Sequence, residues 1–253
     1  MPASRQKSVS VKPTVAIIGF GAFGRLMAAH LAPHGNLCIR DPGNTCGASH
    51  NGQPVKSASL NAVAVCDYII LAVPVRQIQS VCRDLAPHLK PGAVVLDVGS
   101  VKLAPTAVMQ AELPAHVDIV GTHPLFGPQS AAGGLKGLKI AICPVRGTRH
   151  RRIAAFLKCA FGLRIIRTTA DAHDREAATV QGLTHLIAKV LVEMEPLPTT
   201  LTTLSYDLLL QAINMVKDDA PNVLDAIERA NPYSKDVREA FFTRAAEVRG
   251  RFE

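Results

Sequence analysis

The chain has 253 residues, 48% of them hydrophobic and only 4% aromatic, and its formal net charge is +8. This composition is that of a globular chain with an aliphatic core, and it excludes an intrinsically disordered protein. The densest basic run, residues 146–152, has no interleaved aromatic residue, and no apolar run approaches the length of a membrane span. We therefore expect neither nucleic acid nor a membrane as a partner, and the positive charge suits solubility or an anionic ligand.

Cysteine usage indicates the compartment. No two cysteines have CxxC spacing, so no zinc or other metal site is expected. Several cysteines lie in apolar runs, where the side chain acts as a small hydrophobe, and this usage predicts a reducing, cytoplasmic environment. The six residues are Cys38, Cys46, Cys66, Cys82, Cys143 and Cys159.

The first structured segment follows a polar, basic stretch, residues 1–12, which we expect to be a flexible tail. A short apolar run, residues 15–18, leads directly into a glycine-rich turn, and a helical pattern comes next. Here the GxGxxG pattern has its required setting of strand, turn and helix, with glycines for the turn, for the approach of a pyrophosphate and for close helix packing. The sequence therefore predicts dinucleotide binding by Gly19-Phe20-Gly21-Ala22-Phe23-Gly24.

An acidic residue follows the second predicted strand. Asp41 stands about where the dinucleotide fingerprint places its ribose-binding carboxylate, which accepts hydrogen bonds from the adenosine 2′-hydroxyl and so favours NAD. Arg40 is adjacent and suits a 2′-phosphate, so NADP remains open. The alternative role for Asp41 is the start of an Asp-Pro-Gly turn.

Further apolar runs alternate with helical patterns. Strands are expected at residues 68–73, 94–98, 117–120, 139–143 and 164–167. This alternation predicts an α/β fold with a doubly wound, Rossmann-type parallel sheet, in which ligands bind beyond the carboxyl ends of the strands. Val73, the last residue of one predicted strand, and Pro74 and Ser100, which follow predicted strands, are therefore expected to border the cofactor.

A histidine follows the strand at residues 117–120. Glycine and proline stop that strand in the segment 121–128, and they hold His123 in a stiff turn at the carboxyl end. Histidine titrates near neutral pH and suits acid–base catalysis. The alternative is a histidine that merely caps the turn.

The second half of the chain predicts only helices, at residues 170–193, 199–217, 221–230 and 234–249. We therefore expect a dinucleotide-binding domain at residues 13–169 and an all-helical substrate and dimerisation domain at residues 170–253. Gln181 and His185 share a helix face, as i,i+4 neighbours do, which suggests a wall facing a cleft.

Together these motifs resemble the prephenate and arogenate dehydrogenases of tyrosine biosynthesis, over nearly the whole chain from residue 13. The glycine loop is generic, whereas the other motifs in this order are specific. They are Asp97-Val98-Gly99-Ser100-Val101-Lys102, Thr122-His123-Pro124-Leu125-Phe126-Gly127-Pro128, His173-Asp174-Arg175 and Val180-Gln181-Gly182-Leu183-Thr184-His185.

The resemblance implies an oxidative decarboxylation of an anionic cyclohexadienyl acid, with hydride transfer to NAD or NADP. His123 would take the proton of the ring hydroxyl, and Ser100 would position that hydroxyl against the nicotinamide. Lys102 would lie near the substrate carboxylates, and Gln181 and His185 would contact the substrate. His173 and Asp174 match the family motif, but we expect them to be structural, as a helix cap and a domain hinge.

Two departures bear on the substrate. Enteric bacterial prephenate enzymes have an arginine that binds a substrate carboxylate, and the similar position in this chain is Asp207. Plant-type enzymes have an Asp or Asn at a position similar to Asp219, and Asp at that position accompanies arogenate as the substrate. A carboxylate attracts the ammonium of arogenate and offers nothing to the ketone of prephenate. Both are therefore expected to bind substrate, with arogenate favoured.

Two other functions remain open. One is a related dehydrogenase for a small hydroxy acid, for which Lys189 is the candidate lysine on the first long helix of the second domain. The other is a nucleotide-binding regulator without activity, which the presence of Ser100, His123 and His185 argues against.

Overall fold

The computed structural model describes residues 12–43, 49–50, 53–54 and 57–253. The expected tail thus lies outside the described residues, apart from Lys12. A seven-stranded sheet has the order β2-β1-β5-β6-β7-β8-β9. The strands are β1 (Thr14–Ile18), β2 (Asn36–Arg40), β5 (Tyr68–Leu71), β6 (Val94–Asp97), β7 (Asp118–Pro124), β8 (Lys139–Arg146) and β9 (Arg164–Arg167), and β3 (Ser49–His50) pairs separately with β4 (Gln53–Pro54).

Every neighbouring pair in the large sheet is parallel except β7 and β8, which run antiparallel. The predicted parallel sheet is thus mostly parallel. The described link between these two strands, residues 125–138, contains turns and no helix. Since parallel neighbours need a long crossover, usually a helix, a link of this kind brings the chain back antiparallel.

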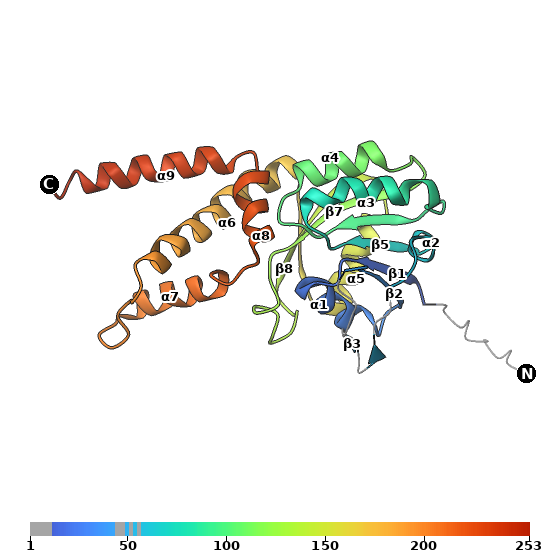
Figure 1. Cartoon of the computed structure of the whole chain (residues 1–253), viewed down its shortest axis with the longest axis horizontal. Coiled ribbons are helices and arrows are strands. Elements are labelled where there is room, and N and C mark those ends of the chain that lie inside the picture. The colour runs from blue at the N-terminus through green and yellow to red at the C-terminus, as the bar shows by residue number, and fades with distance from the viewer. Residues whose placement is uncertain (1–11, 44–48, 51–52, 55–56) are drawn as a thin grey trace, which may run out of the picture.

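Helices cover both faces of the sheet (Figure 1). One face packs against α1 (Ala22–Leu31) and α5 (His150–Phe161). The other packs against α2 (Leu60–Ala64), α3 (Ile78–Leu85) and α4 (Leu103–Glu112), with the short 3₁₀ turns η1 (Val75–Gln77) and η2 (Ala86–His88) beside them. The central strands are buried on both faces, which explains their continuous apolar runs.

The helical half begins at the sheet and extends away from it (Figure 1). Its elements are α6 (Ala170–Glu193), α7 (Leu204–Val216), α8 (Pro221–Asp225), the π-helical turn η3 (Ala226–Ala230) and α9 (Ser234–Arg249). Thr169 caps α6 by accepting a hydrogen bond from the Ala172 amide at 3.2 Å. Thr203 caps α7 in the same way, so α7 begins later than the predicted residue 199. Within the described residues, no helix has the length and hydropathy to cross a bilayer.

Candidate active site

The glycine loop is shaped by two close backbone approaches. Gly19 has φ +98°, and a Cβ there would lie 2.3 Å from the carbonyl oxygen of Ala72. A Cβ on Gly24 would lie 2.2 Å from the carbonyl oxygen of Gly19. At Gly21, by contrast, no described atom lies within 4 Å of the added Cβ. Gly19 and Gly24 thus permit close backbone packing in which no side chain would fit. Gly21 faces open space, which lets a pyrophosphate approach the backbone.

Asp41 lies against this loop. One of its carboxylate oxygens, Oδ2, accepts a hydrogen bond from the Phe20 amide at 2.7 Å, and its own amide donates to Ser57 Oγ at 3.1 Å. The Arg40 guanidinium instead donates to the carbonyl oxygen of Ala58 at 3.0 Å. The N-terminus of α1 has no side-chain cap, so its amides are available to an anion. These residues fit a dinucleotide cofactor.

The other predicted cofactor residues lie at the same edge of the sheet. The Val73 side chain is beside the loop, with its Cγ1 3.2 Å from the Cβ position of Gly19. Pro74 opens the turn η1. Ser100 lies half-buried in the bend between β6 and α4. The carboxyl ends of β5 and β6 thus border the loop, as ligand sites in open α/β sheets do.

His123 is buried on β7, with 3% of its surface exposed. Since side chains alternate along a strand, His123 and Thr122 point to opposite faces of the sheet. The Thr122 hydroxyl donates to the carbonyl oxygen of Asp97 at 2.5 Å, which ties β7 to β6 next to the histidine. His123 therefore faces the helices α4 and α6.

A second histidine contacts His123 directly. His123 Nδ1 and His173 Nε2 are 2.8 Å apart, and His173 Nδ1 lies 2.7 Å from Asp174 Oδ1. A carboxylate only accepts, so we assign the Nδ1 proton of His173 to that bond, and His173 Nε2 then accepts from His123 Nδ1–H. This arrangement leaves the lone pair of His123 Nε2 free to accept a proton. His173, which we expected to be structural, thus contacts the predicted base directly, and its role stays a prediction.

Asp174 also fastens the two halves of the chain together. It is wholly buried, and its carboxylate accepts hydrogen bonds from the amides of Lys102 at 2.7 Å and Leu103 at 2.8 Å. Asn231 Nδ2 donates to the Asp174 carbonyl oxygen at 2.8 Å. Asp174 is therefore a helix cap, as expected, but it caps α4 rather than its own helix.

Lys102 is not placed where the resemblance suggested. Its side chain is wholly buried, and its ammonium pairs with Asp97 and donates to the Thr122 carbonyl oxygen at 2.7 Å. It therefore makes no contact with a substrate carboxylate from this position. Burial, the Lys102 charge and His173 together hold the pKa of His123 well below 6.5. Burial raises the pKa of Asp97, and the Lys102 ammonium opposes that rise.

Polar groups along α6 continue from His173 away from the sheet. At 1.5 Å per residue, Gln181 lies about 12 Å and His185 about 18 Å from His173 along the helix axis. Gln181 Oε1 is buried and has no hydrogen-bond partner among the described residues. It is therefore the polar atom on this helix that is best placed to meet a ligand.

His185 has both ring nitrogens engaged. Nδ1 lies 2.9 Å from the Gln181 carbonyl oxygen, and Nε2 lies 3.0 Å from Asp219 Oδ2. Both partners are acceptors, so each bond requires a proton on the ring nitrogen that makes it. His185 thus orients Asp219, whose side chain is 37% exposed. The structure shows Asp207 half-buried in the first turn of α7, and its part in substrate binding stays a prediction.

Lys189 does not serve the hydroxy-acid alternative. Its ammonium lies 2.6 Å from Glu228 Oε1, on the side of α6 that packs against η3. A lysine held in an ion pair far along the helix is not available as an acid or base beside the glycine loop.

Comparison with known proteins gives consistent matches. Residues 40–162 match the family model of the nucleotide-binding domain of prephenate dehydrogenase. Arogenate dehydrogenase 2, chloroplastic, of Arabidopsis thaliana is 28% identical over 94% of this chain and 72% of its own length. Cyclohexadienyl dehydrogenase of Zymomonas mobilis is 30% identical over 71% of this chain and 66% of its own. The chain spans only 43% of a probable arogenate/prephenate dehydrogenase of Methanocaldococcus jannaschii.

Solved structures share the fold. The prephenate dehydrogenase of A. aeolicus in complex with hydroxyphenyl propionate and NAD+ has a TM-score of 0.74 and 20% identity, covering 96% of this chain and 91% of that one. Synechocystis arogenate dehydrogenase has a TM-score of 0.65 and 21% identity, covering 94% and 92%. At these identities the likeness extends to the fold.

Proposed function

Because this chain belongs to the prephenate and arogenate dehydrogenase family, we propose that it oxidises and decarboxylates a cyclohexadienyl acid with a nicotinamide cofactor. The products would be tyrosine from arogenate or 4-hydroxyphenylpyruvate from prephenate. The observation that carries this proposal is the buried chain His123–His173–Asp174, which leaves His123 Nε2 as a neutral proton acceptor at the sheet edge bearing the glycine loop.

The residues divide the chemistry as follows. His123 Nε2 accepts the proton of the ring hydroxyl, and His173 with the Asp174 carboxylate stabilises the imidazolium that forms. Ser100, at the neighbouring strand end, positions the hydroxyl. The bound nicotinamide supplies the hydride acceptor. Loss of carbon dioxide from the opposite ring carbon makes the ring aromatic, and the proton held by His123 returns to the ring oxygen.

Substrate binding falls to the helical half, residues 170–253, as a unit distinct from the dinucleotide-binding residues 13–169. Gln181 offers an unpaired amide oxygen, and Asp219 offers a carboxylate held by His185. An ammonium group is attracted by a carboxylate and a ketone is not, so the proposed substrate is arogenate rather than prephenate. NAD is the proposed cofactor, since Asp41 faces the loop while Arg40 is turned to Ala58.

Initial-rate kinetics with arogenate and prephenate, each with NAD and NADP, test this proposal. The expected result is the highest kcat/KM with arogenate and NAD. His123→Asn should abolish turnover and leave NAD binding nearly intact, because the ring is remote from the glycine loop. If no combination of substrate and cofactor is turned over, or if His123→Asn remains active, the proposed function fails.

Two matched variants address the substrate. Asp219→Asn should raise KM for arogenate and leave KM for prephenate nearly unchanged, because only arogenate carries an ammonium. Asp207→Asn, in the first turn of α7, measures whether a second carboxylate contributes to arogenate binding. An equal effect of Asp219→Asn on both substrates would remove Asp219 from the amine site.

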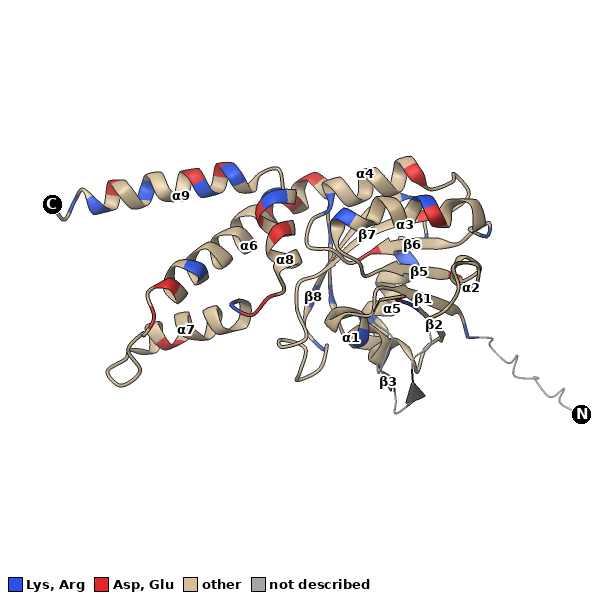
Figure 2. Cartoon of the chain, in the orientation of Figure 1, with Lys and Arg blue, Asp and Glu red and all other residues tan. Residues whose placement is uncertain are grey.

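The helical half is also the proposed surface of a homodimer. Helix α7 carries a single charged residue, Asp207, and appears almost free of charge in Figure 2. Leu204 is 76% exposed on it and Leu208 is 55% exposed, far more than leucines of a helix that is buried on folding. Light scattering should give twice the mass of the chain, and Leu208→Glu should halve it.

A further inference from the structure

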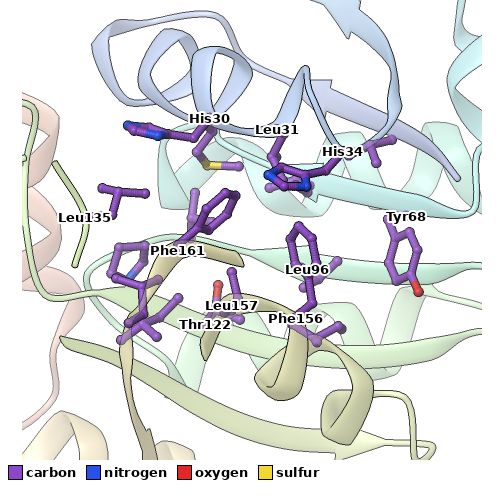
Figure 3. A pocket seen from close by; sticks show the side chains of 18 of the residues that line it. His30, Leu31, His34, Tyr68, Leu96, Thr122, Leu135, Phe156, Leu157 and Phe161 are labelled. Carbon is purple, nitrogen blue, oxygen red and sulfur yellow. The ribbon is translucent and has the colours of Figure 1, made fainter. Parts of the chain in front are cut away.

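An apolar cavity of about 330 Å³ lies on the face of the sheet opposite His123 (Figure 3). It is bounded by α1 and α5 and by the strands beneath them. Thr122 and Pro124 line it, whereas His123 between them points to the other face. The cavity is therefore separate from the proposed catalytic site, although it lies directly behind the catalytic strand.

The cavity arises from the way the two helices pack. Helix α1 packs mainly on β1, and α5 packs mainly on β8 and β9. Side chains of both helices reach over the strands between them, where Ile70 and Leu96 are buried but still line the cavity. The helices meet through aromatic rings, with His34 5.3 Å from Phe156 and 5.4 Å from Phe161 between ring centroids. Ile70 and Leu96 lie beneath this bridge. The space is thus built by the arrangement of whole elements and not by one small side chain.

Its lining is extended both along and across the strands, and it reaches from Val15 on β1 to Ile140 on β8. The lining runs from Tyr68, at the amino end of β5, to Pro124, at the carboxyl end of β7. Tyr68 is level with Asp118 through the register of β6, so the two ends are six residues apart along the strands, or roughly 20 Å. Because a cavity of about 150 Å³ holds benzene, this one holds roughly a dozen carbon atoms. The length along the strands accommodates an extended chain of this size.

The polar side chains of the lining select for an anion. No aspartate or glutamate lines the cavity, whereas Arg152, His30 and His34 do. None of these three forms a salt bridge or a side-chain hydrogen bond with the described residues, and the lining hydroxyl of Thr122 is already bonded to Asp97. The available polar groups are thus the N–H donors of these three side chains, one of them a permanent cation, and the hydroxyl of Tyr68.

We propose that this cavity binds a straight-chain monocarboxylate of about ten to twelve carbon atoms, with its chain under the aromatic bridge and its carboxylate at Arg152. Binding requires no part of the dehydrogenase reaction, so this proposal stands apart from the proposed function. Since Thr122 and Pro124 flank His123 on β7, an occupant would also restrain the strand that carries the histidine.

Fluorescence titration with 11-(dansylamino)undecanoate tests the proposal on the full chain. Displacement by dodecanoate and by dodecanol, below the concentrations at which they aggregate, separates the contributions of head and chain. We expect saturable binding at one site per chain and displacement by dodecanoate at a lower concentration than by dodecanol. Linear, unsaturable binding, or equal displacement by acid and alcohol, would overturn it.

Matched variants locate the site. Arg152→Gln should weaken dodecanoate binding by up to about fivefold and leave dodecanol unchanged, whereas Arg151→Gln, the exposed neighbour outside the lining, should change neither. Leu157→Trp, from α5, and Met27→Trp, from α1, should fill the cavity and weaken both ligands by tenfold or more. The chain has no tryptophan, so each new indole also reports folding. Full affinity in both folded tryptophan variants would place the ligand elsewhere.

Discussion

Replacing His173 in the hydrogen-bonded series His123–His173–Asp174 tests most directly whether these contacts support the proposed proton transfer to His123. In His173→Leu, the Nδ1–H of His123 would face a hydrocarbon side chain in a dry site instead of an acceptor 2.8 Å away. The ring would then no longer be held in the tautomer that leaves Nε2 unprotonated, and the imidazolium formed in the reaction would lose its link to Asp174. We therefore expect a loss in kcat.

The size of the expected decrease in kcat follows from the hydrogen bond between His123 and His173 that is lost. A hydrogen bond to a charged group contributes about 1.5–3 kcal/mol, which corresponds to a decrease in kcat of roughly 10- to 150-fold. His173→Gln keeps an acceptor near the Nε2 position, so it should retain most of the rate. KM and the affinity for the cofactor should change little in either variant, because His173 touches neither the glycine loop nor the predicted substrate residues.

Steady-state kinetics and thermal unfolding of both variants provide the assay. His150 supplies the control, because it is equally buried but lies at the start of α5, so His150→Leu should cost stability without a selective loss in kcat. A folded His173→Leu variant with kcat within about threefold of the parent would refute the argument. An equal loss in the glutamine variant would refute the role of the acceptor.

Four further outcomes are expected. The proposed base must be neutral, and burial and the Lys102 charge lower the pKa of His123, so kcat/KM should fall on the acidic side only below pH 6.5. Initial rates measured across pH would contradict this if the fall began at pH 6.5 or above. Because the pKa of His123 is lowered in the folded protein, the free energy of unfolding should decrease as the pH falls below 6.5, where the unfolded chain takes up a proton that the folded chain does not. Denaturation at several pH values measures this decrease. Lys102→Met should cost about 3–5 kcal/mol of unfolding free energy by leaving Asp97 buried and unpaired, whereas the double variant with Asp97→Leu should recover most of it. Gly19→Ala should destabilise the fold because of its positive φ and the close Ala72 carbonyl, while Gly21→Ala should stay folded and lose NAD affinity in a titration.

Local pattern was enough to predict much of the fold. The helices at residues 170–193 and 234–249 have the bounds expected from periodicity, and the glycine loop adopts its expected geometry. These features depend on neighbouring residues, whose spacing is visible in the sequence. The antiparallel return of β8 is different, because strand direction depends on how residues 125–138 cross space rather than on the pattern of the strand itself.

The contacts of the site depend on long-range packing. His123 and His173 are 50 positions apart, and nothing in either segment shows that they touch. The resemblance implied that Lys102 lies near the substrate carboxylates, whereas its ammonium is buried and paired with Asp97, as a buried charge requires. A signal was present, since Asp97 interrupts an otherwise apolar strand five positions earlier and requires a buried partner. The cavity between α1 and α5 likewise follows from helix placement, which periodicity does not determine.

The capping of α4 by Asp174 has a consequence for motion. One residue at the start of α6 holds two amides of α4, receives the Asn231 amide and orients His173. A swing of the helical half about residue 169 would break the two bonds from the α4 amides, and His123 would lose its partner His173 in the same movement. The bonds of Asp174 to Asn231 and His173 lie within the helical half and would stay intact. The two halves therefore cannot separate at this point while His123 keeps its hydrogen bond to His173. The proposed base keeps its partner His173 only while the two halves stay joined at Asp174, and we expect substrate to enter without their separation at this point.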